Sequence, residues 1–63
     1  MGFSHWEVFF LRPDGNWEQI MNFPEHNQGR WSNLGEVLEF LASGECSGHY
    51  RAESFRIEFV LNA

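Results

Sequence analysis

The chain of 63 residues contains no lysine, two prolines and a single cysteine. Because Cys46 has no partner within the chain, it cannot form an internal disulfide, and the sequence fits a reducing compartment. No apolar run approaches the length of about 20 residues that a membrane-spanning helix needs. The first residues, MGFSHWEV, lack the positive charge and the uninterrupted apolar run of a signal peptide. We therefore expect a cytoplasmic protein without a membrane partner.

The charge balance is strongly negative. Nine acidic residues stand against four basic ones, all arginine, and the formal net charge at pH 7 is −5. Trp6, Phe10 and Trp17 could stack nucleic-acid bases from a sheet, but such platforms lie in a positively charged groove that this composition does not supply. The sequence therefore predicts no direct binding of nucleic acid and favours a basic protein as partner.

Apolar residues make up 43% of the sequence, including seven Phe and three Trp, which is enough for a packed core. No repeat, linker or low-complexity tract interrupts the chain. A length of 63 residues is near the lower limit for independent folding, so we expect one small domain over residues 1–63.

A β-hairpin is predicted in the first third of the chain. Residues 5–12, HWEVFFLR, are apolar on both faces, which is typical of a central strand covered on two sides. A turn follows, because Pro13 presets φ and Gly15 tolerates positive φ. The second strand is predicted over residues 16–23 and ends before Pro24, which has no N–H for a ladder.

A helix is predicted next, with Ser32 or Asn33 as its cap and Gly44 as its stop. Four side chains recur at the spacing of one helix face: Leu34, Val37, Leu38 and Leu41. The outer side and its flank would then carry Glu36, Glu39 and Phe40. Residues 45–54 are expected to form a loop or an early strand. Residues 55–61, FRIEFVL, alternate as a half-buried strand.

The order ββαβ predicts an α+β domain. A right-handed crossover places the third strand beside the first, giving a three-stranded antiparallel sheet of order 2-1-3 with one helix packed on one face. The other face would expose either Phe9 and Leu11 or Trp6, Val8 and Phe10. Three covers are possible: the loop 24–31 with Trp31 as its plug, a second copy in a homodimer, or a different protein.

Few residues in the sequence support a catalytic site or a metal site. Cys46 and His49 form one C-x-x-H pair, whereas zinc needs four ligands, normally two close pairs, and His5 and His26 lie elsewhere. Cys46 is expected to follow a helix C-terminus, and Glu45 beside it disfavours a thiolate. We therefore predict no enzyme, no cofactor and no metal.

The carboxylates have two interpretations. They provide ordinary solubility, or they imitate the spacing of phosphates and occupy a basic groove on another protein. In the second interpretation the binding residues combine acids with aromatic anchors: Glu25, Glu36, Glu39, Glu45, Trp17, Trp31 and Phe40.

The hairpin LRPDGNW and the helix NLGEVLEFLASG, in so small and acidic a chain, resemble the single-domain inhibitors that phages make against host machinery, anti-CRISPR proteins among them. The resemblance covers size, charge and element order. It implies stoichiometric binding to a basic, nucleic-acid-handling protein in the host cytoplasm, with nucleic-acid mimicry as the mechanism. The alternative is a structural or self-associating homodimeric module without inhibitory activity.

Overall fold

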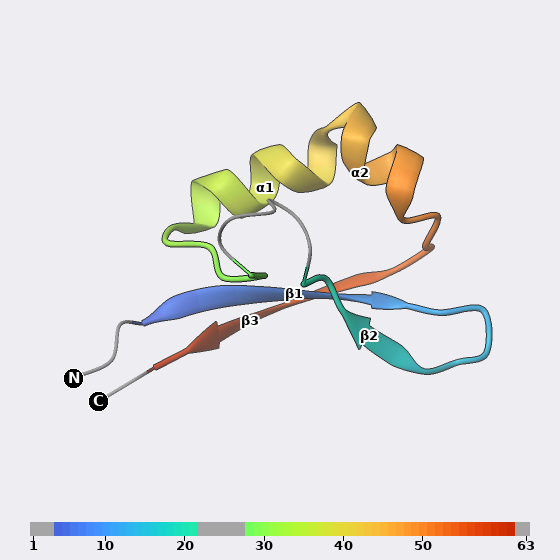
Figure 1. The fold of residues 1–63 in the computed structure, drawn as a ribbon, viewed down its shortest axis with the longest axis horizontal. Coiled ribbons are helices and arrows are strands. Elements are labelled where there is room, and N and C mark those ends of the chain that lie inside the picture. Colours follow the sequence, from blue (N-terminus) through green and yellow to red (C-terminus); the bar gives the residue numbers. More distant parts are fainter. Residues whose placement is uncertain (1–3, 22–27, 62–63) are drawn as a thin grey trace.

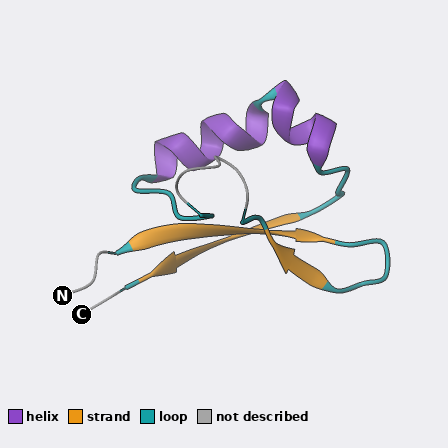
Figure 2. Cartoon of the chain, in the orientation of Figure 1, coloured by secondary structure: helices purple, strands orange, loops and turns teal. Residues whose placement is uncertain are grey.

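The computed structural model describes residues 4–21 and 28–61. Five elements follow one another along the chain: β1 (His5–Leu11), β2 (Trp17–Gln19), α1 (Leu34–Ala42), α2 (Gly44–His49) and β3 (Phe55–Val60). The two helices lie on the same side of the sheet, and no described element covers the opposite side (Figures 1 and 2). The predicted α+β class is confirmed, with two short helices where one was expected.

The sheet has the predicted order, β2-β1-β3, and β1 is antiparallel to both neighbours. β3 pairs with β1 over its whole length, from His5 opposite Val60 to Phe10 opposite Phe55. β2 is shorter than predicted and ends at Gln19. Farther along β1 a different segment takes its place, because the Trp6 N–H donates to the Trp31 carbonyl at 2.8 Å and the Trp31 N–H donates to the Trp6 carbonyl at 3.0 Å.

The N-terminus of α1 matches one of the two caps that the sequence allowed. The Asn33 side-chain oxygen accepts a hydrogen bond from the Glu36 N–H at 2.8 Å. This bond satisfies one of the N–H groups that a helix N-terminus leaves without an internal partner. The Glu36 carboxylate accepts a hydrogen bond from the Ser32 hydroxyl at 3.4 Å, so both candidate cap residues contact the first turn.

The second helix corrects the prediction of a loop or strand after residue 44. The hydroxyl group of Ser43 caps both the C-terminus of α1 and the N-terminus of α2. Its Oγ donates to the Phe40 carbonyl at 2.6 Å and accepts from the Cys46 N–H at 3.1 Å. Gly44 is consequently the first residue of α2 and not the stop of a longer helix. Local capping by a serine outweighs the low helix propensity of the sequence GECSGH.

The core lies between the helices and the sheet. It consists of Val8, Ile20, Trp31, Val37, Phe40 and Cys46. Trp31 packs beneath α1, with its ring centroid 5.4 Å from that of Phe40. Because Phe40 turns inward to meet this ring, Leu38 on the same helix is 53% exposed. The predicted apolar stripe is therefore wrong by part of a turn: Phe40 is buried, and Leu34 and Leu38 are exposed.

Among the described residues, no helix has the length and apolar character required to cross a bilayer.

Candidate functional site

Two of the predicted aromatic anchors lie inside the protein. Phe40 is 6% exposed and Trp31 is 2% exposed, so both rings belong to the core of this fold and not to its surface. Trp31 also does not cover the second face of the sheet, because it packs in the layer beneath the helices. Trp17 is 40% exposed, on the hairpin. Glu25 lies outside the described residues.

The outer surface of the helices carries exposed carboxylates. Glu36 and Glu39 lie on α1, and Glu45 lies in the first turn of α2. Glu36 and Glu45 each stand near a helix N-terminus, where the helix dipole favours negative charge. Within residues 4–21 and 28–61, no cation forms an ion pair with any of the three. The charge of these three carboxylates is therefore not offset by an ion pair in the described part of the chain.

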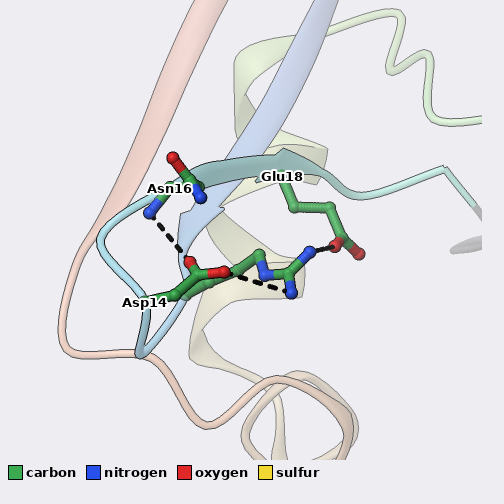
Figure 3. Close-up of polar contacts among 4 residues, drawn as sticks. Asp14, Asn16 and Glu18 are labelled. Atoms are coloured by element: carbon green, nitrogen blue, oxygen red, sulfur yellow. Dashed lines mark hydrogen bonds and ion pairs between the residues drawn. The ribbon is translucent and has the colours of Figure 1, made fainter.

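Two carboxylates of the hairpin share one cation. Arg12 lies between two of them, with Nη2 at 3.3 Å from Asp14 and Nη1 at 3.0 Å from Glu18 (Figure 3). The backbone N–H of Asn16 donates to Asp14 at 3.0 Å. This hydrogen bond, helped by the nearby Arg12 charge, lowers the pKa of Asp14 below its ordinary value. Arg12 therefore offsets part of the negative charge of Asp14 and Glu18.

On the face of the sheet that is turned away from the helices, one acid has an arginine partner and another has a histidine partner. The Arg56 Nε lies 2.9 Å from a Glu58 oxygen, and the His5 Nε2 lies 2.9 Å from a Glu7 oxygen. Among the described acids that have no arginine partner, Glu36, Glu39 and Glu45 lie on the helices, whereas Glu53 precedes β3 and Glu7 contacts His5.

The outer surface of α1 also carries two exposed leucines beside its acids. Leu34 is 39% exposed and Leu38 is 53% exposed, and they follow each other at i, i+4 on one flank of the helix. Glu36 and Glu39 occupy the other flank. We call these four residues the α1 surface. An apolar centre beside charged residues is the usual composition of a protein interface. Periodicity assigned both leucines to the core, and no local pattern indicated their exposure.

The open face of the sheet carries the first of the two residue sets that the sequence allowed. Phe9 and Leu11 lie on it, half-buried, with Arg56 opposite Phe9 and Trp17 opposite Leu11 in the two ladders. The Arg56 guanidinium carbon lies 4.6 Å from the centroid of the Phe9 ring and 5.0 Å from that of the Trp17 ring. A guanidinium over aromatic rings is attractive, and its stem covers apolar area. The chain thus covers part of this face with its own arginine.

The thiol of Cys46 lies in an environment unsuited to catalysis. It belongs to the first turn of α2, so the expected position after a helix C-terminus is wrong. The side chain is 1% exposed, and burial raises the pKa of the thiol, which favours the neutral form. A hollow of about 340 Å³ lies beside it, lined also by Tyr50, whose pKa burial raises as well. This hollow therefore offers neither a thiolate nor a phenolate near neutral pH.

In the described part of the chain, no three His, Cys, Asp or Glu side chains come together as a group that could hold a metal ion. The α1 surface is the feature that combines exposed apolar area with uncompensated charge, and it is the candidate site. Comparison with models of protein families, with curated proteins and with solved structures finds no match.

Proposed function

We propose that the protein is a small inhibitor that binds a basic, nucleic-acid-handling protein through the α1 surface and thereby excludes nucleic acid from it. One observation supports this proposal above the others: Asp14, Glu18 and Glu58 have arginine partners, whereas the three acids of the helices have none among the described residues. These three acids are Glu36, Glu39 and Glu45; Glu53, before β3, also has no arginine partner. A surface with uncompensated charge attracts an oppositely charged surface and accelerates the encounter.

The mechanism is occlusion. Carboxylates on one helix accept charge-assisted hydrogen bonds from Arg and Lys side chains that otherwise bind phosphates. Leu34 and Leu38 supply the desolvated contact that holds the complex once the charges have brought the two proteins together. Because Phe40 and Trp31 are buried, these leucines replace them as the expected anchors.

The alternative of self-association through this surface is disfavoured by its charge. Two copies meeting at the α1 surface would bring Glu36 and Glu39 of one copy close to the same residues of the other, and like charges at an interface cost several kcal/mol. The α1 surface therefore fits a different, basic partner better than a second copy.

The test exchanges charge at the α1 surface. Immobilised wild-type protein and the variant Glu36→Lys with Glu39→Lys are used to capture proteins from a lysate of the organism that carries the gene, at low and high salt. The control is Glu18→Lys with Glu53→Lys, which changes the net charge equally at exposed positions away from α1. We expect the control to capture the same basic protein as the wild type and the α1 variant to capture none of it.

The captured protein is then purified and mixed with a fluorescent oligonucleotide, and the anisotropy of the label is followed as the small protein is added. The proposal requires that the oligonucleotide is released in stoichiometric proportion. It fails if the oligonucleotide stays bound at saturation, or if charge reversal at Glu36 and Glu39 leaves binding unchanged.

A further inference from the structure

Within the described part of the chain, β3 has one free edge. In the order β2-β1-β3 it pairs with β1 and with no other described strand. The Leu11 N–H donates to the Ser54 carbonyl at 3.1 Å, just before β3 begins. Hydrogen-bonded pairs alternate along an antiparallel ladder, so the even-numbered residues of β3 exchange hydrogen bonds with β1. The backbone N–H and C=O groups of the odd-numbered residues point away from β1: Phe55, Ile57 and Phe59.

Proteins usually prevent association of exposed strands with charged side chains, prolines, bulges or very short strands. β3 carries two charged residues of opposite sign, Arg56 and Glu58, but no lysine or proline. β3 is six residues long, FRIEFV, and pairs residue for residue with β1 without a bulge. Phe59 on this strand is 52% exposed. The edge is therefore long, regular and partly apolar.

We propose that β3 pairs antiparallel with β3 of a second copy about a two-fold axis at Ile57, forming one continuous six-stranded sheet. In this register Ile57 lies opposite Ile57, and Phe55 of each copy lies opposite Phe59 of the other. The three pairs are those whose backbone groups already point outward. Arg56 of each copy lies opposite Glu58 of the other, so the two cross-strand pairs at this interface have opposite charges.

Charge selects this register over its neighbours. Only registers that place even-numbered residues of one copy opposite even-numbered residues of the other are possible. A shift by one residue would put side chains of the helix-facing side opposite side chains of the open face. Centring the axis on residue 56 sets Arg56 against Arg56, and centring it on residue 58 sets Glu58 against Glu58. Both arrangements repel. Only the axis at Ile57 pairs opposite charges throughout.

The charges around Glu58 favour the same arrangement. Glu58 lies opposite Glu7 in the ladder with β1, which is a pairing of like charges. Within its own strand it contacts only the Nε edge of Arg56, at 2.9 Å. A guanidinium has five N–H donors, so Arg56 can keep this contact and still donate to Glu58 of the second copy.

The two-fold axis is perpendicular to the sheet, so the helices of both copies lie on the same side of it. The α1 surface stays exposed in each copy. This inference therefore stands independently of the proposed function, and its failure would leave the α1 surface untouched.

The experiment measures the oligomeric state of the full chain by sedimentation velocity from micromolar to millimolar concentration. The wild type is expected to dimerise reversibly. Glu58→Arg and Arg56→Glu, each alone, should weaken the dimer at least about tenfold, because both charge pairs become repulsive. An equimolar mixture of these two variants should form a heterodimer, since opposite charges then face each other again, although both chains remain net negative. Glu53→Arg is the control for charge, and it should dimerise as the wild type does.

A chain made by chemical synthesis with an N-methyl group on Ile57 tests the backbone directly, because that N–H points to the free edge. It should fold with the circular dichroism of the wild type and remain monomeric. A wild type that is monomeric over the whole range overturns the proposal, and so does a folded N-methyl protein that dimerises normally. If the N-methyl protein does not fold, the equimolar mixture of Glu58→Arg and Arg56→Glu provides the test. The proposal is wrong if these two variants do not associate.

Discussion

The burial of Phe40 leads to the most direct test of the fold. We predict that Phe40→Ala costs about 3 to 5 kcal/mol of the free energy of unfolding, the range for removing a buried Phe side chain. The ring is 6% exposed and contacts two other rings, with centroids 5.4 Å away at Trp31 and 6.4 Å away at Tyr50. Its removal therefore creates a cavity and also ends two aromatic contacts.

This loss is large in proportion to the total. A chain of this length has a free energy of unfolding of about 3 to 9 kcal/mol. For so small a domain each kcal/mol corresponds to about 4 to 8 °C in Tm, so Phe40→Ala should lower Tm by at least about 12 °C or leave the chain unfolded at room temperature. Urea titration followed by circular dichroism measures the change.

Leu38→Ala is the matched control, on the same helix and two residues away. Leu38 is 53% exposed, so we expect a loss of less than about 1 kcal/mol, partly offset by the higher helix propensity of alanine. The helical periodicity of the sequence predicts the opposite ranking, with Leu38 buried and Phe40 outside. If Leu38→Ala destabilises the protein more than Phe40→Ala, the rotation of α1 described above is wrong.

Three further predictions concern the backbone, the thiol and the open face. Gly29→Ala should lower the free energy of unfolding by more than about 2 kcal/mol in urea titration, because Gly29 has a φ of +80° and a Cβ there would lie 2.6 Å from the Ile20 carbonyl oxygen. The control Gly15→Ala, at φ +88° with nothing within 4 Å of the added Cβ, should lower it by only about 1 kcal/mol. Equal losses in the two variants would contradict the close approach at Gly29. Cys46 should react with a thiol reagent at neutral pH only as fast as the chain unfolds. Burial raises the pKa of the Cys46 thiol in the folded state, so the folded protein holds the thiol proton more tightly than the unfolded chain does. The free energy of unfolding should therefore fall as the pH rises above the pKa of the unfolded thiol, about 8.5. An unchanged urea midpoint on raising the pH from neutral to alkaline would show that the thiol is not buried. Arg56→Lys keeps the charge but loses the flat guanidinium over two aromatic rings, and should cost about 0.5 to 1 kcal/mol; no change would show that these contacts are not stabilising.

Local chemistry was sufficient to predict several features of this fold. Pro13 and Gly15 marked the hairpin turn, and Asn33 was one of two named caps, because turns and caps depend on residues within a few positions of one another. A short segment that is apolar on both faces predicted β1, alternation of apolar residues predicted β3, and the order of elements then predicted the sheet order 2-1-3. The second helix was not predicted, because its capping signal is incomplete. Ser43 is the N-cap, but Cys46 occupies the third helical position, where a capping box has Glu or Gln.

The candidate site depended on packing that no local signal describes. In α1 the spacing of apolar residues allowed more than one buried face, and a Trp distant in sequence decided between them: Trp31 packs under the helix and brings Phe40 inward, which exposes Leu34 and Leu38. The positions of the carboxylates could be read from the sequence, but their partners could not, since Arg12 and Arg56 reach acids only through the hairpin and the strand geometry.

The sequence by itself therefore determined the class, the order of the strands and the sign of the charge, because these follow from composition, alternation and turn chemistry over short stretches. Tertiary structure alone decided which face of α1 is buried, which acids lack a counterion and which edge of the sheet is open. These properties depend on contacts between residues far apart in the chain, where packing of rings such as Trp31 and Phe40 outweighs the preferences of any single helix or strand.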